Sequence, residues 1–149
     1  MQNPFFTMKK IIFILVLTIS FIGCTVDPQE NSELPFVSVN KNIDLNLPEF
    51  IDLIVPAGWA YTSGGNNGII IYNTGIANST NEFKAFDRAC PLKDCGAPMV
   101  FNGSTKLQCI CDSSEYSILD GSPQTSGVSV FAKEYFVTRI SPTFLLITN

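Results

Sequence analysis

Beyond residue 36 the chain consists of short apolar or alternating runs, separated by turn-forming residues. No stretch keeps the 3.6-residue period of an amphipathic helix over a useful length. The pattern therefore predicts an all-β domain over residues 36–149. The expected strands are residues 43–47, 51–55, 59–62, 68–73, 83–86, 107–110, 116–119, 135–140 and 144–148. Turn-forming segments that contain Gly, Asn or Pro separate most of them, at residues 63–68, 102–103, 120–121 and 141–143.

The first 23 residues follow a different pattern. Lys9 and Lys10 precede an uncharged apolar run over residues 11–23, and this run ends directly at Cys24. A basic start followed by a short apolar run is typical of an export signal. The run is shorter than the roughly 20 apolar residues that a permanent membrane-spanning helix needs. We therefore expect residues 1–23 to be a signal peptide that is removed.

The residues at the end of this run, Ser-Phe-Ile-Gly-Cys over 20–24, resemble a bacterial lipobox, although Phe21 stands where leucine is usual. The resemblance implies a lipoprotein precursor in which Cys24 is lipidated and becomes the N-terminus at a membrane surface. An ordinary cleaved signal peptide and an uncleaved anchor are the alternatives.

The segment 24–35 is polar, acidic and interrupted by prolines, which is typical of a flexible tether. Its acidic start also resembles the surface-export signals of Bacteroidetes-type lipoproteins. We expect an exported protein that its lipid holds at the outer membrane or cell surface of a Gram-negative bacterium.

The charge of the mature chain excludes one class of partner. Nine basic residues less Lys9 and Lys10 leave 7 against 13 acidic residues, so the formal charge is 7 − 13 = −6. Nucleic acid is not an expected partner of such an acidic domain. Asp112 and Glu115 lie close together in sequence, but no nucleophile, base or metal motif accompanies them, and we expect no enzymatic activity.

Assigning Cys24 to lipid leaves an even set of cysteines in the domain, Cys90, Cys95, Cys109 and Cys111. In an exported domain such a set favours disulfides, and four cysteines permit three pairings. A four-cysteine zinc site is an alternative, but the C-x-C spacing of the second pair suits it poorly.

The two cysteine segments, CPLKDCG over 90–96 and CICDSSEY over 109–116, resemble the two loops of a Rieske iron–sulfur domain. In that family the loops read C-x-H-x-x-C and C-x-C-H-G-S-x-F, and here Tyr116 takes the aromatic position. The resemblance covers about two thirds of the chain. It implies a Rieske-like antiparallel β-sandwich with two cysteine-bearing loops at one end.

This chain departs from the family at the histidines. Leu92 and Asp112 occupy the two histidine positions, and the chain contains no histidine at all. A Rieske centre holds one iron through two cysteines and the other through two histidines. Leu92 has no donor atom, and a lone carboxylate at Asp112 is a hard ligand at a site built for imidazole. We therefore expect no cofactor, with a [2Fe–2S] cluster held through Cys90 and Cys109 as the alternative.

The resemblance also implies a disulfide pairing. In Rieske domains of the cytochrome bc type, the residues that match Cys95 and Cys111 form a disulfide. The other two, Cys90 and Cys109, match the ligands of a single iron, which places their sulfurs within about 4 Å of each other. Without iron, we expect these two to oxidise to a second bridge.

The sequence thus favours a cluster-free, Rieske-like lipoprotein that acts as a binding or structural module at the cell envelope. Its expected partners are the membrane, through the lipid, and an envelope protein. An electron carrier with a nonstandard [2Fe–2S] cluster and a thiol–disulfide redox protein are the alternatives.

Overall fold

The protein is known from a computed structural model, which describes residues 34–93 and 95–149. The expected signal peptide, the expected lipidation site Cys24 and nearly all of the expected tether lie outside the described residues. Within the described part of the chain, no helix is long and apolar enough to cross a membrane.

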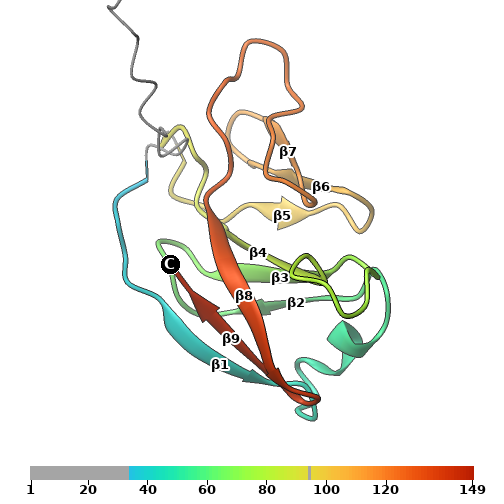
Figure 1. Cartoon of the computed structure of the whole chain (residues 1–149). Coiled ribbons are helices and arrows are strands. Elements are labelled where there is room, and N and C mark those ends of the chain that lie inside the picture. The colour runs from blue at the N-terminus through green and yellow to red at the C-terminus, as the bar shows by residue number, and fades with distance from the viewer. Residues whose placement is uncertain (1–33, 94) are drawn as a thin grey trace, which may run out of the picture.

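Two antiparallel sheets make up the domain (Figure 1). The larger has the strand order β1-β9-β8-β4-β3-β2, and the smaller has the order β5-β6-β7. The strands are β1 (Asn40–Asp44), β2 (Trp59–Thr62), β3 (Ile69–Asn73), β4 (Phe83–Asp87), β5 (Val100–Phe101), β6 (Lys106–Gln108), β7 (Glu115–Ser117), β8 (Glu134–Ser141) and β9 (Phe144–Thr148). A single 3₁₀ turn, η1 (Ile51–Ile54), joins β1 to β2 in the described chain.

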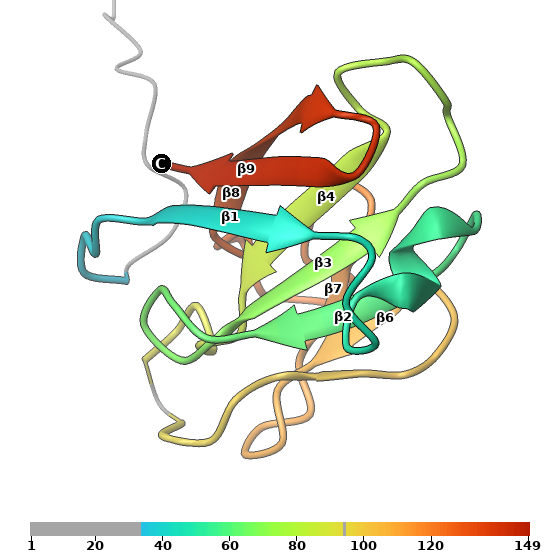
Figure 2. The same ribbon diagram turned by 90° about the horizontal axis from the view of Figure 1, so that it is seen from below.

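The larger sheet curls until its two halves face each other (Figure 2). One hydrophobic core fills the space between the halves, with side chains from β3 and β4 on one side and from β1, β8 and β9 on the other. The edge strands do not pair, but Lys41 on β1 donates to the carbonyl and hydroxyl oxygens of Ser63, just after β2, at 2.9 and 2.7 Å. The curl is thus held by apolar burial inside and by a polar contact at its open edge.

A second core lies between the outer face of β3–β4 and the smaller sheet. All five residues of β3 are buried, because successive side chains point into opposite cores. Ile69 and Ile71 belong to the first core, while Ile70 and Tyr72 belong to the second. The continuous apolar run of this strand therefore reflects its position between two packed layers.

The predicted all-β class is confirmed, and the two cysteine loops lie at one end with the smaller sheet. The strands predicted at 59–62 and 144–148 begin and end where β2 and β9 do. The strand predicted at 51–55 is wrong, since residues 51–54 form η1 and Val55 is its C-cap. Backbone donors at Leu53 and Val55 bond to carbonyls three residues earlier, so only Leu53 of the four residues in η1 is buried. The two-residue strand β5 was not predicted.

We predict that Leu53→Ala lowers the free energy of unfolding by about 2–5 kcal/mol, because it leaves a cavity in the first core. Leu53 is fully buried there. The neighbouring Ile54 is 57% exposed, so Ile54→Ala serves as the matched control with a change within about 0.5 kcal/mol. Urea unfolding of both variants tests this. Equal losses would contradict the packing of η1 described above.

Candidate functional site

Two disulfides join the loop that follows β4 to the loop that follows β6. Cys90 pairs with Cys109, with Cα atoms 5.7 Å apart, and Cys95 pairs with Cys111, at 5.6 Å. These are the two pairs that the Rieske resemblance implied. All four predicted cysteines thus come together at one end of the molecule.

The two bridges differ in their surroundings. Cys90 and Cys109 are each 1% exposed and form part of the second core. In the other bridge Cys111 is exposed and Cys95 is half-buried, and Ile110 between the two bridges projects into solvent. The inner bridge is therefore a core element, whereas the outer bridge is open to solutes.

A buried carboxylate at the end of β4 positions the first cysteine loop. Asp87 is fully buried and accepts five hydrogen bonds, one of them from the backbone N–H of Ala89 at 2.8 Å, directly before Cys90. Asn66 donates through its backbone and its side-chain amide at 2.6 and 2.9 Å, and Asn67 through its backbone at 3.2 Å. The Tyr135 hydroxyl on β8 donates at 2.7 Å. These hydrogen bonds offset the free-energy cost of removing the carboxylate from water, because each of its oxygens accepts at least two of them.

Gly65 allows this close approach. Its φ is +61°, and a Cβ at this position would lie 2.5 Å from an Asp87 carboxylate oxygen and 2.6 Å from the Tyr135 hydroxyl. A larger residue would push the loop off the carboxylate. The glycine-rich segment predicted as a turn is therefore also a cap over Asp87.

Further contacts hold the first loop at its far end. The side-chain amide of Asn67 donates to the carbonyl of Gly96 at 3.0 Å, just beyond Cys95. The Arg88 side chain donates to the carbonyl of Met99 at 3.0 Å and lies 3.7 Å over the ring of Tyr61. Both ends of the loop are thus tied to the larger sheet.

The second cysteine loop is closed mainly by its own polar groups. The N–H of Cys109 donates to the carbonyl of Ser114, and the N–H of Ser113 donates back to Cys109. Asp112 accepts from the N–H and the hydroxyl of Ser114 at 2.9 and 2.8 Å. The carboxylate at the position that matches the second Rieske histidine therefore serves as a turn-forming acceptor within its own loop.

The donor set does not fit a Rieske centre. Such a centre needs two thiolates for one iron and two imidazoles for the other. Here both thiol pairs are joined in disulfides, Leu92 has no donor atom, and one oxygen of Asp112 is engaged by Ser114. Among residues 34–93 and 95–149, no three His, Cys, Asp or Glu side chains are grouped so that they could hold a metal ion.

The positioning residues around Asp87 are the part of the site that sequence reasoning missed. The only signal was an Asp that ends an apolar strand, followed directly by a cysteine loop, together with a Gly-Gly-Asn-Asn turn. Such residues are ordinary turn formers, so nothing in the pattern marked Asp87 and Asn66 as partners.

Comparisons with known proteins give limited similarity. No family model and no curated protein match this chain. Among solved structures the chain is similar to the ferredoxin of carbazole 1,9a-dioxygenase from Nocardioides aromaticivorans IC177. The identity is 13%, the match covers 76% of this chain and 98% of that chain, and the TM-score is 0.47.

We predict that Tyr135→Phe lowers the free energy of unfolding at pH 7 by about 1–3 kcal/mol, since Asp87 loses a donor. Burial, and then the hydrogen bond and charge of Asp87, raise the pKa of the Tyr135 hydroxyl well above its usual 10.0. The folded protein therefore keeps the proton at pH values where the unfolded chain loses it, and stability falls as the pH rises above about 10.

The difference in the free energy of unfolding between the unmodified protein and Tyr135→Phe should become smaller above about pH 10. The reason is that the variant has no hydroxyl at residue 135 to ionise. Urea unfolding from pH 7 to 11 measures it. The control is Tyr72→Phe, since the Tyr72 hydroxyl is not among the five donors to Asp87. A constant difference at all pH values would refute this role of Tyr135.

Proposed function

We propose that the chain is a membrane-anchored, Rieske-like lipoprotein without an iron–sulfur cluster, which acts as a non-enzymatic binding or structural module at the cell envelope. The inner bridge carries the proposal. Cys90 and Cys109, which match the ligands of a single iron, are joined to each other inside the second core. Because a disulfide consumes both thiolates, the first iron of a cluster would have no cysteine ligand.

The bridges supply the organisation that a cluster gives to its loops. Each constrains the unfolded chain, typically by about 2–4 kcal/mol, and the second closes little new loop and so adds less. The sequence separations are 19 and 16 residues. An exported location supports this chemistry, since disulfides form and persist outside the cytosol.

The anchor is the other half of the proposal and is supported by the sequence alone. A lipid on Cys24 would place the membrane, and an envelope protein, within reach of a domain that follows a short tether. The Gram-negative outer membrane or cell surface is the location that we propose.

A thiol–disulfide role is the second candidate, and the exposed outer bridge favours it. An attacking thiolate needs access to a sulfur atom, and Cys111 is exposed while the inner pair is not. The first cysteine loop supplies one cation, Lys93, to lower a thiol pKa, while Asp112 beside Cys111 opposes it. The structural role is therefore preferred.

Iron analysis and disulfide mapping of anaerobically purified protein test the absence of a cluster. We expect iron far below one atom per chain, no visible absorption, and two bridges in peptides mapped without reduction. The Cys90→Ser variant is the control, because it must show a free thiol at Cys109. A stoichiometric [2Fe–2S] spectrum would contradict the proposal. So would a peptide map that shows one disulfide and two free cysteines. Reduction of the outer bridge by glutathione at a cytosolic potential would favour the redox role instead.

Metabolic labelling with palmitate tests the anchor. We expect label on the full chain and recovery in the membrane fraction, whereas Cys24→Ser should carry no label and leave that fraction. Cys111→Ser is the matched control, since it also removes one cysteine but must keep the label. If the full chain carried no label, the proposed lipid anchor would be contradicted. The absence of a cluster would be unaffected, because the iron analysis and disulfide mapping test it separately.

A further inference from the structure

A groove opens in the larger sheet where β4 and β8 separate. The two strands pair only at Ala85 with Tyr135 and at Phe86 with Glu134. Beyond these pairs β8 continues beside β9, and the β3–β4 connection over residues 74–82 turns away from it (Figure 1). The space between has a volume of about 690 Å³. It lies away from the cysteine loops and is a separate site.

Neutral hydrogen-bonding side chains form one wall of this groove. They are the two amides and two hydroxyls of Asn78, Ser79, Thr80 and Asn81, all exposed. Phe136 and Thr138 on β8 also line the groove, together with Phe83 of the first core and Val137, which packs against that core. The groove thus combines donors, acceptors and apolar surface, as small-molecule sites do.

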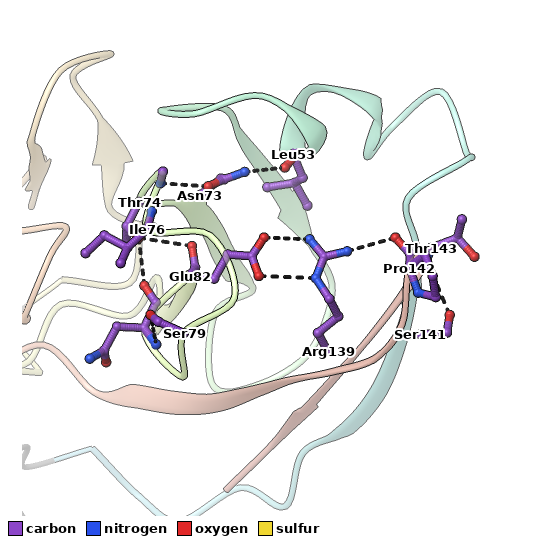
Figure 3. A network of polar contacts seen from close by, with 12 residues as sticks. Leu53, Asn73, Thr74, Ile76, Ser79, Glu82, Arg139, Ser141, Pro142 and Thr143 are labelled. Carbon is purple, nitrogen blue, oxygen red and sulfur yellow. Dashed lines mark hydrogen bonds and ion pairs between the residues drawn. The ribbon is translucent and has the colours of Figure 1, made fainter.

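The charged groups at the groove neutralise each other. Lys84 and Glu134 pair at 2.8 Å, and Arg139 pairs with Glu82 through two bonds of 2.7 and 3.2 Å. Arg139 also donates to the carbonyl of Pro142 at 2.8 Å, so its guanidinium is held on both sides (Figure 3). A charged ligand would therefore meet only charged side chains that are already paired with an opposite charge. This arrangement favours a neutral ligand.

Phe136 supplies an aromatic surface beside these polar groups. It is 72% exposed, the highest value among the large hydrophobic side chains of the described chain. The faces of aromatic rings carry partial negative charge and attract the weakly positive C–H groups of a sugar ring. An exposed ring next to hydroxyls and amides matches the two kinds of surface that a sugar presents.

The backbone of β8 adds further groups. In an antiparallel strand, N–H and C=O groups point alternately to the two sides, and β9 occupies only one side. Within the described residues, no backbone hydrogen bond joins residues 136–141 to residues 74–83. The groove-side amides of β8 are thus available to a ligand.

We propose that this groove binds a neutral oligosaccharide of two or three sugar units, of the kind that an envelope glycan presents. The inference rests on the proposed binding role and names its ligand. An extended peptide added beside β8 fits less well, because the Arg139–Glu82 pair crosses its path. Arg139 lines both this groove and a smaller space of about 490 Å³, which Glu82, Ile140 and Pro142 also line.

Saturation-transfer NMR of the full chain tests this, in a zwitterionic detergent because sugar-based detergents would compete. The probes are maltotriose, cellotriose and chitotriose, with trigalacturonate as the charged counterpart and a blocked (Thr-Val)₃ peptide as the strand mimic. We expect at least one neutral trisaccharide to bind with a Kd of about 1 mM or tighter. Trigalacturonate and the peptide should bind at least tenfold more weakly.

Phe136→Ala should weaken that binding by about tenfold or more, and Asn81→Ala by a few-fold. Phe36→Ala is the matched control, since Phe36 is 69% exposed but does not line the groove, and it should leave the Kd unchanged. Absence of binding by all three trisaccharides at about 20 mM would overturn the inference, as would tighter binding of the peptide or unchanged binding by Phe136→Ala. The iron content and the disulfide map are measured independently of sugar binding. The proposed sugar site and the proposed cluster-free domain can therefore be contradicted separately.

Discussion

The burial of a single carboxylate constrains the end of the molecule that carries the cysteines. An ionised group can remain inside a protein only where donors surround it, and Asp87 draws its donors from three separate segments. The glycine-rich turn, the start of the first cysteine loop and β8 must all meet at its two oxygens. The path of the chain into Cys90 therefore follows from this requirement, and the position of the second loop follows in turn through the bridges.

Sulfur and apolar packing together organise the end of the domain where the family resemblance points to metal. The inner bridge packs with Met99, Leu107 and Tyr116, and its half-cystines behave as small hydrophobic residues of that core. Leu92, at the position that matches a Rieske histidine, is half-buried and has no donor atom for a metal.

Sequence reasoning succeeded where the local pattern and the tertiary environment agree. The strand 59–62 was predictable because turn-forming residues lie on both sides of it, and the strand 144–148 because the turn at 141–143 precedes it directly. Residues 51–55 were misassigned because a short apolar run looks alike in a strand and in a 3₁₀ turn. The disulfide pairing came only from the family resemblance, since four cysteines allow three pairings. The network at Asp87 and the groove beside β8 depend on contacts between distant segments, and no local pattern encodes them.

The position of β3 between two cores has a consequence for how the protein opens. Its partners on one face can separate while those on the other remain packed, so the domain contains two units that share one wall. We therefore expect the amide protons of β3 to exchange with solvent only when both units open, and to be among the slowest of the described residues. The bridges belong to the unit that contains the smaller sheet, and there they limit how far the loops can part. Fluctuations in the other unit, which contains the groove, are free of that covalent limit.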